Sequence, residues 1–284
     1  MEIRSLDKLG FDVIFESFSQ AFADYEIQQT KAGLTTMLTR RGFCPERSFG
    51  AFDGDKLVSF TLNGVGEFQK VRTAYDTGTG TLKEYRGMGL ASQVFTHSLP
   101  HLKSAGIKQY LLEVLQHNTK AAKVYRDLGF KESREFYYFL VNRTQVTAKS
   151  FELPANYQLK QVRVEECLPG AVFHDFAPSW QNSFEAILRK PDDFIAFGVF
   201  YEDLLAGYCI TEPLNGDITQ IAVDKKHRKR GLGNSLLARA VDVAESDMLK
   251  VVNTELQAEE FTSFLASHNI KPSGKQFEMV RAIS

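Results

Sequence analysis

The sequence lacks any apolar run long enough for a membrane helix, since no window approaches ~18 uncharged apolar residues. Its opening segment carries acidic residues from Glu2 to Glu16, where a signal peptide needs an unbroken apolar stretch. Cysteine is also scarce: Cys44, Cys167 and Cys209 form an odd and widely spaced set, which argues against a disulfide scaffold. We therefore expect a cytoplasmic protein with no membrane partner.

An excess of charge of either sign is absent as well. The formal net charge of −1 gives no general attraction to nucleic acid, so we expect no nucleic-acid partner. The basic run Lys225–Arg230 has to be interpreted from its local context. We expect no metal site either, because Pro100 separates His97 from His101 and no third ligand is evident.

Glycine marks a feature that the sequence does contain. The segment "RGMGLA", beginning at Arg86, recurs as "RKRGLG", beginning at Arg228, 142 residues later in a chain of 284. A repeat spaced at half the chain length predicts two related domains. We place them at residues 1–145 and 146–284, with the joint near Pro154.

The surroundings of the two segments follow the same predicted order. The turn signal Asp53-Gly54 joins two alternating apolar runs and predicts a hairpin. Helical spacing of apolar residues follows each glycine segment, and then come an apolar strand, a short helix and a last strand. Each half is therefore predicted to be an α+β unit with a central sheet. In the first half we expect a strand at 2–6, helices at 11–25, 31–40, 90–104 and 119–128, and strands at 109–115 and 135–141.

A loop of the form R-x-x-G-x-small between a strand and a helix can hold an anion. Small residues let backbone N–H groups approach the ligand, and the helix N-terminus adds its dipole, so a diphosphate is a natural guest. Two other interpretations compete, a solvated basic turn and a dinucleotide-binding fold. The dinucleotide motif G-x-G-x-x-G is absent at both segments.

The first half also contains "NTKAAKVYRDLGF", with Asn118, Tyr125 and Gly129 at fixed spacing. Together with "RGMGLA", this resembles the GNAT superfamily of acyl-CoA-dependent N-acyltransferases, whose loop reads R/Q-x-x-G-x-G/A and whose later helix reads N-x-x-A-x-x-x-Y-x-x-x-G-F. The resemblance covers most of each half and is stronger for the first. It implies two tandem GNAT-like domains, each with a mixed, mostly antiparallel central sheet flanked by helices.

The resemblance further implies acetyl-CoA as co-substrate, as the small-molecule acyl donor, and a primary amine, from a small molecule or a protein, as acceptor. The residues expected to bind it are Arg86, Gly87, Met88, Gly89, Leu90, Ala91 and Asn118 in the first half, and Arg228, Arg230, Gly231, Leu232 and Gly233 in the second. Lys225 and Lys226 are optional contacts to further phosphate.

Proton transfer assigns the catalytic roles. An amine with a pKa near ~10 needs a base at neutral pH, and the departing thiolate benefits from an acid. We expect Glu113 to be the base and Tyr125 the acid, a pairing that looks like the one in ribosomal-protein N-terminal acetyltransferases of this family. Asp76 is the alternative base, and Asn118 is also a plausible helix N-cap.

The second half departs from this pattern, because Leu265 stands opposite Tyr125, Asn253 opposite Glu113 and Ala258 opposite Asn118. Glu255 is a possible substitute base. Three explanations remain open for this half: a structural partner, a CoA sensor, or a catalyst with an unrecognised acid. For the whole chain we expect an N-acetyltransferase, and the alternative is a CoA-binding regulatory or scaffolding protein.

Overall fold

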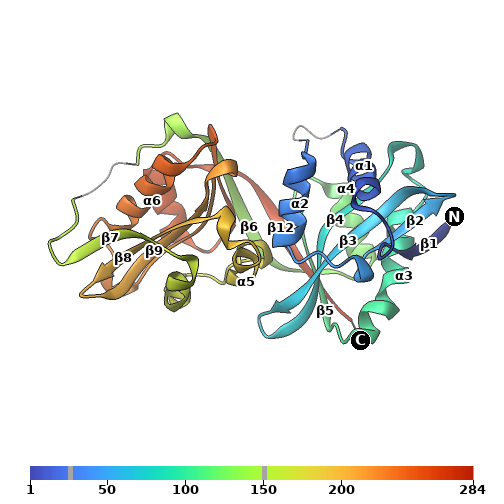
Figure 1. Cartoon of the computed structure of the whole chain (residues 1–284), viewed down its shortest axis with the longest axis horizontal. Helices are drawn as coiled ribbons and strands as arrows, with labels where there is room; N and C mark the ends of the chain where they lie inside the picture. Colours follow the sequence, from blue (N-terminus) through green and yellow to red (C-terminus); the bar gives the residue numbers. More distant parts are fainter. Residues whose placement is uncertain (25–27, 149–151, 284) are drawn as a thin grey trace. The chain divides into compact units, whose positions relative to one another are not determined.

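The structure is a computed structural model that describes residues 1–24, 28–148 and 152–283. Packing divides the chain into two compact units, which we call unit 1 (Met1–Ser133 and Phe277–Ser284) and unit 2 (Arg134–Gln276). The C-terminal segment thus belongs to the first unit (Figure 1). The predicted extension of the first helix to Tyr25 lies outside the described residues, as does part of the predicted joint.

Unit 1 has a mixed central sheet, as predicted. Strands β1 to β4 pair antiparallel in chain order, and β4 pairs with β5 in parallel. The last residues of β12 lie next to β5. The strands are β1 (Glu2–Ser5), β2 (Phe49–Asp53), β3 (Lys56–Phe68), β4 (Val71–Thr81), β5 (Gln109–Leu115) and the part of β12 (Pro272–Ala282) that begins at Phe277.

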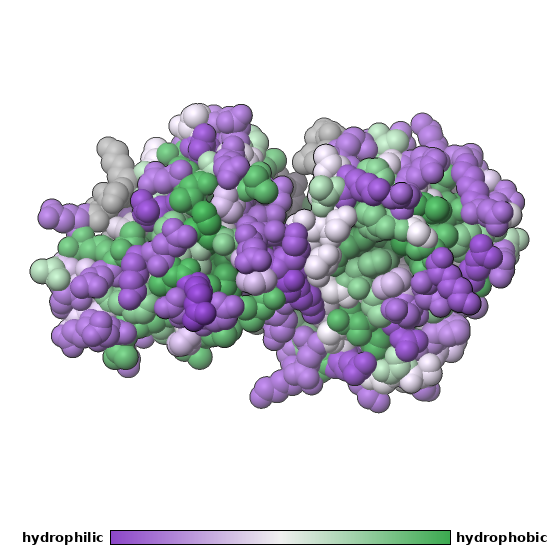
Figure 2. Space-filling view, viewed as in Figure 1, coloured by the Kyte–Doolittle hydropathy of each residue, from purple (hydrophilic) through white to green (hydrophobic). Residues whose placement is uncertain are grey.

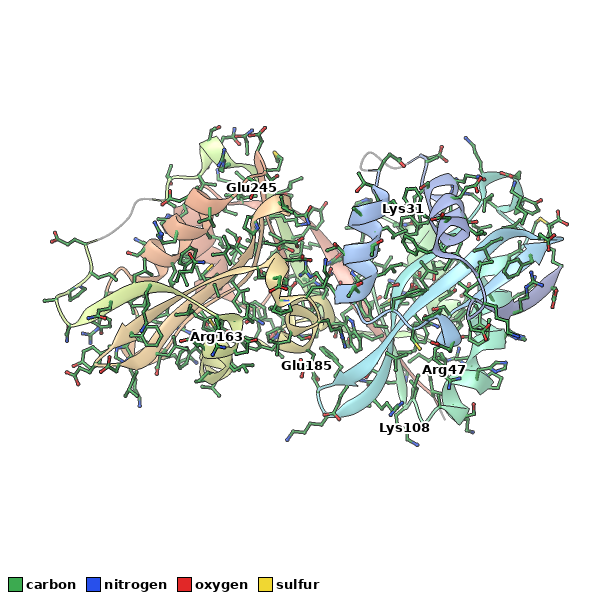
Figure 3. The ribbon with its side chains drawn as sticks, in the orientation of Figure 1. Lys31, Arg47, Lys108, Arg163, Glu185 and Glu245 are labelled. Atoms are coloured by element: carbon green, nitrogen blue, oxygen red, sulfur yellow. The ribbon has the colours of Figure 1, made fainter. Side chains whose placement is uncertain are left out.

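Helices cover both faces of this sheet. One apolar cluster joins α1 and α2 to Phe60 and Leu62 of β3. A second cluster joins α3 and α4 to Ala74 of β4 and Leu112 of β5. The two helix pairs therefore pack on opposite faces of the sheet. The helices are α1 (Phe11–Ala21), α2 (Lys31–Arg40), α3 (Leu90–Ser104) and α4 (Thr119–Asp127), with short 3-10 helices η1 (Pro45–Arg47) and η2 (Lys83–Tyr85). Side chains fill the space between sheet and helices (Figure 3).

Unit 2 repeats this architecture with a less regular start. Strands β7 to β10 pair antiparallel in chain order, β10 pairs with β11 in parallel, and β11 pairs antiparallel with β6. The elements are β6 (Lys131–Asn142), β7 (Tyr157–Val162), β8 (Ile195–Tyr201), β9 (Leu204–Glu212), β10 (Asp217–Val223), β11 (Met248–Glu255), α5 (Phe184–Leu188), α6 (Leu232–Val243) and α7 (Glu259–Ser267). The predicted boundary between residues 145 and 146 follows the 3-10 helix η3 (Arg143–Gln145).

The predicted helical region before Arg189 is broken in unit 2. Where unit 1 has α1, unit 2 has the 3-10 helix η4 (Val164–Phe173), which contains Pro169. Proline lacks the N–H that an α-helix needs in its interior, so the chain here makes short turns instead. The 3-10 turn η5 (Trp180–Asn182) and the five-residue helix α5 complete this region, and the other 3-10 helices described in unit 2 are η6 (Pro191–Asp193), η7 (Pro213–Asn215) and η8 (Lys225–His227).

In each unit the two parallel strands separate. The ladder between β4 and β5 ends at Tyr75 and Leu111, although both strands continue. In unit 2 the ladder is shorter still, with Asp217 paired to Lys250. A β-bulge accompanies each separation, at Thr77 in β4 and at the equivalent Thr219 in β10. Bulges redirect neighbouring side chains and often lie beside active sites.

No helix among the described residues is long and apolar enough to cross a membrane. On the face shown in Figure 2, hydrophobic residues are interspersed with hydrophilic ones on each unit.

The assignment of the C-terminal segment to unit 1 can be tested at Met279, which is fully buried in the cluster of α3, α4 and β5. Met279→Ala should lower the free energy of unfolding by roughly 2–5 kcal/mol, because it leaves a cavity in that core. Hydrogen exchange should speed up in β5 and not in β10. Lys275→Ala, at an exposed position of the same strand, is the control. Faster exchange in β10 instead would contradict the assignment.

Candidate functional site

The two glycine segments adopt matching backbones at the start of a helix. Gly89 caps α3 with φ 71°, and Gly231 caps α6 with φ 84°. Two residues earlier, Gly87 has φ 81° and Lys229 has φ 59°. All four lie in the left-handed region, which favours glycine, so each loop presents its backbone where a side chain would otherwise intrude. Backbone N–H groups at the start of these helices can hold an anion.

The arginine that opens each loop holds the loop in place. Arg86 donates from Nε to the carbonyl of Thr81 (3.2 Å) and from Nη2 to the carbonyl of Ala21 (2.8 Å). Its Nη1 pairs with Asp24 at 2.9 Å, and this guanidinium hydrogen bond lowers the pKa of the Asp24 carboxyl. The side chain therefore joins the end of β4, the end of α1 and the loop.

Arg228 makes the same contacts in unit 2. Its Nε donates to the carbonyl of Val223 (3.0 Å), Nη2 donates to the carbonyl of Phe173 (3.2 Å), and Nη1 pairs with Asp175 at 3.0 Å. A further contact at 3.0 Å joins Nη1 to Glu260. Both arginines thus use their guanidinium donors within the protein, which leaves the loop amides as the groups best placed for a ligand.

The other residues predicted to bind the co-substrate divide into two groups. Met88, with 53% of its surface exposed, and Arg230 lie on the outer side of their loops. Leu90 and Leu232 are buried and anchor the helices in the core. Ala91 and Gly233 are half-buried, and a Cβ on Gly233 would lie 3.2 Å from the ring of Phe264. Asn118 caps α4, its side chain accepting from the Ala121 N–H at 3.2 Å.

Tyr125 and Asp76 meet where β4 and β5 separate. The Tyr125 hydroxyl donates to Asp76 Oδ2 at 3.3 Å. Asp76 also accepts from the Gly78 N–H (2.9 Å) and the Thr79 hydroxyl (2.8 Å). Burial raises the pKa of the Asp76 carboxyl, and these hydrogen bonds oppose the rise only in part. Asp76 is therefore a carboxyl that holds its proton more tightly than usual.

Glu113 lies on the other face of the sheet. Its Oε2 accepts from the Tyr75 hydroxyl at 3.2 Å. Tyr75 and Asp76 are consecutive strand residues, so their side chains point to opposite faces. Burial and the Glu113 charge raise the pKa of Tyr75 well above its usual range. The structure thus brings Tyr125 to the alternative base Asp76, and it places Glu113 across the opening between the strands.

The positions opposite these residues in unit 2 carry none of this chemistry. Leu265 is fully buried in the core, and Ala258 caps α7 without a side-chain hydrogen bond. Asn253 is buried and donates to Ser179 Oγ at 2.7 Å. Glu255 pairs with Arg134 at 2.9 Å, so its carboxylate is already engaged.

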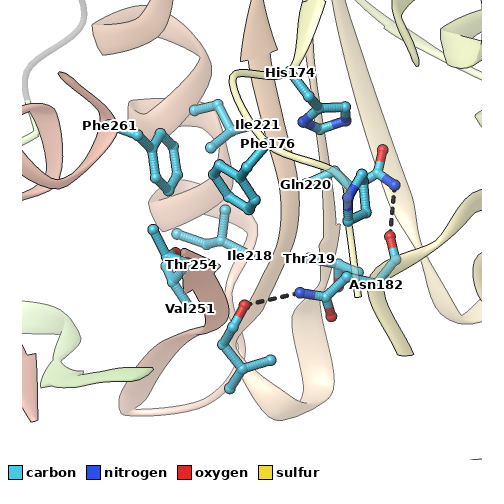
Figure 4. A pocket seen from close by; sticks show the side chains of 12 residues that line it. His174, Phe176, Asn182, Ile218, Thr219, Gln220, Ile221, Val251, Thr254 and Phe261 are labelled. Carbon is cyan, nitrogen blue, oxygen red and sulfur yellow. Dashed lines mark hydrogen bonds between the residues drawn. The ribbon is translucent and has the colours of Figure 1, made fainter. Parts of the chain in front are cut away.

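Unit 2 nevertheless contains a groove of about 790 Å³ beside its glycine loop, within the usual size of ligand sites. The loop forms one side through Arg228, Lys229 and Gly231, and α7 contributes Glu260 and Phe261. His174 and Phe176 line the groove and also a smaller cavity of about 30 Å³ between β10 and β11 (Figure 4).

A polar network that sequence reasoning missed lies at this end of the groove. The Tyr208 hydroxyl is 2.6 Å from His174 Nε2 and 2.8 Å from Gln220 Oε1, and Gln220 Nε2 donates to the Asn182 carbonyl at 2.6 Å. Tyr208 lies on β9, Gln220 on β10 and Asn182 in η5, and His174 follows η4. A difference between the repeats could have revealed this network. The residues of unit 1 that are equivalent to His174, Tyr208 and Gln220 are Phe22, Phe60 and Gly78.

No group of three or more His, Cys, Asp or Glu side chains that could hold a metal ion occurs within residues 1–24, 28–148 and 152–283.

Each unit thus has a mixed set of strands in which two parallel strands separate beside a glycine loop at a helix N-terminus. The sequence model of the acetyltransferase (GNAT) family matches residues 12–130 and 159–264, so the chain belongs to this family, with two copies of its domain. The predicted resemblance is confirmed.

Two similar proteins carry the name N-alpha-acetyltransferase. N-alpha-acetyltransferase MAK3 of Arabidopsis thaliana is 28% identical over 98 residues, which are 34% of this chain and 52% of that protein. N-alpha-acetyltransferase 30 of Schizosaccharomyces pombe is 31% identical over 102 residues, 35% of this chain and 67% of that protein. The matches thus span between about half and two thirds of the length of these relatives.

Two solved structures share the fold over nearly the whole chain. A tandem GNAT protein from the clavulanic acid biosynthesis pathway has a TM-score of 0.73 at 13% identity and covers 100% of this chain and 99% of its own. A GCN5-related N-acetyltransferase from Sphaerobacter thermophilus has a TM-score of 0.71 at 14% identity, covering 99% and 95%.

The partly buried His174 predicts how stability depends on pH. Burial lowers the pKa of His174 below its ordinary value of 6.5, so the unfolded chain binds a proton there before the folded chain does. The contribution of His174 to the free energy of unfolding should be fully present above pH 6.5. It should fall as the pH drops through that value, by up to ~1.4 kcal/mol per pH unit. Denaturant unfolding from pH 8 to 5 should show a shallower fall for His174→Gln. His117→Gln, at an exposed position, should not change the slope.

Proposed function

We propose that the protein is an N-acetyltransferase that moves an acetyl group from acetyl-CoA to a primary amine by direct attack on the thioester. The observation that carries the proposal is the meeting of Tyr125 and Asp76 in unit 1. It lies where β4 and β5 separate, on the face that α3 and its glycine loop also cover. A diphosphate at the loop and a thioester at the separated strands would lie on one side of the sheet.

Tyr125 is the acid in this proposal, and Asp76 prepares it. In its protonated form Asp76 can donate to the phenolic oxygen of Tyr125, which turns the Tyr125 proton toward the departing sulfur. The raised pKa of Asp76 favours that form. As the C–S bond breaks, the sulfur takes the Tyr125 proton, and Tyr125 recovers one from Asp76.

Glu113 is the proposed base. It faces the side of the sheet opposite the glycine loop, so an amine that enters from that side meets Glu113 before it meets the thioester. The carboxylate accepts the ammonium proton, directly or through water. The freed amine forms the C–N bond to the carbonyl carbon as the C–S bond breaks. The nitrogen then loses a second proton, which replaces the one that Asp76 gave up, and Glu113 releases its proton to solvent.

The names of the curated relatives favour a protein N-terminus as the first acceptor to test. Unit 2 keeps a glycine loop and a groove but has Leu265 in place of a tyrosine acid, which favours binding of CoA there. The alternative function, a CoA-binding regulatory protein, predicts binding without thiol release for any amine.

Calorimetric titration should find two CoA sites, and matched loop variants should remove them one at a time. Met88 and Arg230 occupy the same loop position, 142 residues apart, and both are exposed. Met88→Glu and Arg230→Glu each place a carboxylate beside one diphosphate site and should weaken that site at least about tenfold, which is ~1.4 kcal/mol. Each variant should retain one unchanged site. A protein that binds no CoA at either loop would refute the proposal.

Thiol release with peptide and small amines tests the catalytic roles. Tyr125→Phe should lower turnover at least about tenfold, the low end of what a positioned acid contributes, with CoA affinity nearly unchanged. Glu113→Gln should lower turnover similarly. Tyr85→Phe is the matched control, because Tyr85 also donates to an aspartate, Asp53, but at an exposed position (2.8 Å). Equal rates for Tyr125→Phe and Tyr85→Phe would remove Tyr125 from the acid role.

A further inference from the structure

The polar network in unit 2 has a defined direction of hydrogen bonding. The Asn182 carbonyl can only accept, so Gln220 presents its Nε2 to it and its Oε1 to Tyr208. The Tyr208 hydroxyl has one proton, which goes to Gln220 Oε1. The Tyr208 oxygen therefore accepts from Nε2 of His174 at 2.6 Å. Each residue in this series of hydrogen bonds fixes the orientation of the next.

This series of hydrogen bonds leaves Nδ1 of His174 without a hydrogen and with its lone pair available. A neutral imidazole carries one N–H, and that hydrogen is on Nε2. Burial lowers the pKa of His174, so the neutral form prevails at neutral pH. The ring lines both the groove and the smaller cavity (Figure 4), and its partner Tyr208 is fully buried in the core.

A free acceptor lies in the same cavity. Asn182 Nδ2 donates to the Val252 carbonyl at 2.8 Å, which turns Oδ1 the other way. Within the described part of the chain no donor meets this Oδ1, although Asn182 is only 6% exposed. The Thr254 hydroxyl, also in the cavity lining, is buried without a partner among the same residues. An unpaired buried polar atom costs free energy unless a ligand or water completes it.

The fold does not require these polar groups. Unit 1 builds the equivalent place from Phe22, Phe60 and Gly78, where the rings of Phe18 and Phe22 are 4.5 Å apart. Replacement of that apolar packing by a histidine, a tyrosine and a glutamine buries hydrogen-bonding groups that must all be satisfied. In unit 2 these groups lie beside the groove and the smaller cavity, both of which His174 lines.

We propose that the groove of unit 2 is a second acyl-transfer site, in which His174 Nδ1 is the base for a primary amine whose amino group enters the cavity beside Asn182 Oδ1. The cavity of about 30 Å³ is suited to an amino group, since one water needs about 10–15 Å³. This proposal rests on the proposed function, because it takes acyl-CoA as the donor at the second loop.

The step balances without a further reactant. The amine nitrogen forms a bond to the thioester carbonyl carbon, and the C–S bond breaks. His174 Nδ1 takes the proton that the nitrogen loses and returns it to the departing sulfur, which leaves as the CoA thiol. Tyr208 and Gln220 are positioning residues that keep Nε2 protonated and Nδ1 available.

The charges around His174 define its pH response. Burial lowers the pKa of His174 most strongly, whereas a side-chain hydrogen bond with Gln220 and the charge of the adjacent Asp175 favour the protonated ring and oppose that shift in part. The other charged groups that line the groove are Arg228 and Lys229 of the loop and Glu259 and Glu260 of α7. Turnover in unit 2 should fall on the acid side with a midpoint below pH 6.5.

The test uses the full chain with unit 1 silenced by Tyr125→Phe and Glu113→Gln. The silenced protein should still release thiol from acetyl-CoA when it is given a panel of amines. This residual release should fall at least about tenfold on addition of His174→Gln, with CoA affinity at the second loop unchanged. Tyr208→Phe, which restores the residue found in unit 1, should lower turnover and move the acid limb to lower pH. Asn182→Ala should raise KM for the amine. His268→Gln, at a different histidine of unit 2 that is buried, is the control.

The outcomes separate the two proposals. If the intact protein releases thiol and the silenced protein releases none, or if its residual release is indifferent to His174→Gln, the second site is refuted and the proposed function stands. If the intact protein binds CoA but releases no thiol with any amine, the proposed function falls and this inference falls with it. Residual release that depends on His174 supports the second site even where unit 1 proves inactive.

Discussion

The site in each unit depends on one guanidinium. Arg86 joins the end of β4, the end of α1 and the glycine loop, and Arg228 joins the equivalent three segments in unit 2 through carbonyls of Val223 and Phe173. These contacts fix a loop whose glycines have left-handed backbones and could not hold a unique shape by side-chain packing. The arginine in the repeated motif is thus explained by the protein's own carbonyls, and the amides of the loop are left for the ligand.

The second constraint is the separation of the parallel strands. The carbonyls and N–H groups of β4 beyond Tyr75 and of β5 beyond Leu111 no longer pair with each other, which opens the sheet beside the loop. The bulge at Thr77 displaces the register just where Asp76 is needed, so that its carboxyl reaches Tyr125 from α4. The positions of the loop, the opening and Tyr125 therefore depend on how β4 separates from β5 and how α3 begins.

Much of unit 1 was predictable because its signals are local. The helices at 31–40 and 90–104 begin and end at the predicted residues, since Thr30 caps the first through its side chain and Gly89 the second through its backbone. The role of Asn118 as an N-cap was likewise predictable and is confirmed. The sequence did not predict the short turns between residues 164 and 193, because Pro169 breaks the helical pattern of apolar residues there.

The chemistry was less predictable where it depends on long-range contacts. His174 lies after an irregular turn, and its partner Tyr208 is 34 residues away on a central strand. Neither residue belongs to a motif, so only alignment of the two repeats in space reveals that Phe22 and Phe60 occupy those places in unit 1. The Asp76 contact with Tyr125 joins residues 49 apart in the same way.

The two units share a backbone and distribute polarity differently over it. Unit 1 carries Asp76 and Tyr125 where unit 2 carries Ile218 and the buried Leu265. Unit 2 carries Gln220, Tyr208 and His174 where unit 1 has Gly78 and two phenylalanines. A repeat that kept only a structural role would be expected to replace buried polar groups by apolar ones, because unsatisfied polar atoms cost free energy. Unit 2 lacks the Asp76 and Tyr125 pair of unit 1 and has a different polar set beside its groove, so the absence of a tyrosine at Leu265 is not by itself evidence that this unit is inert.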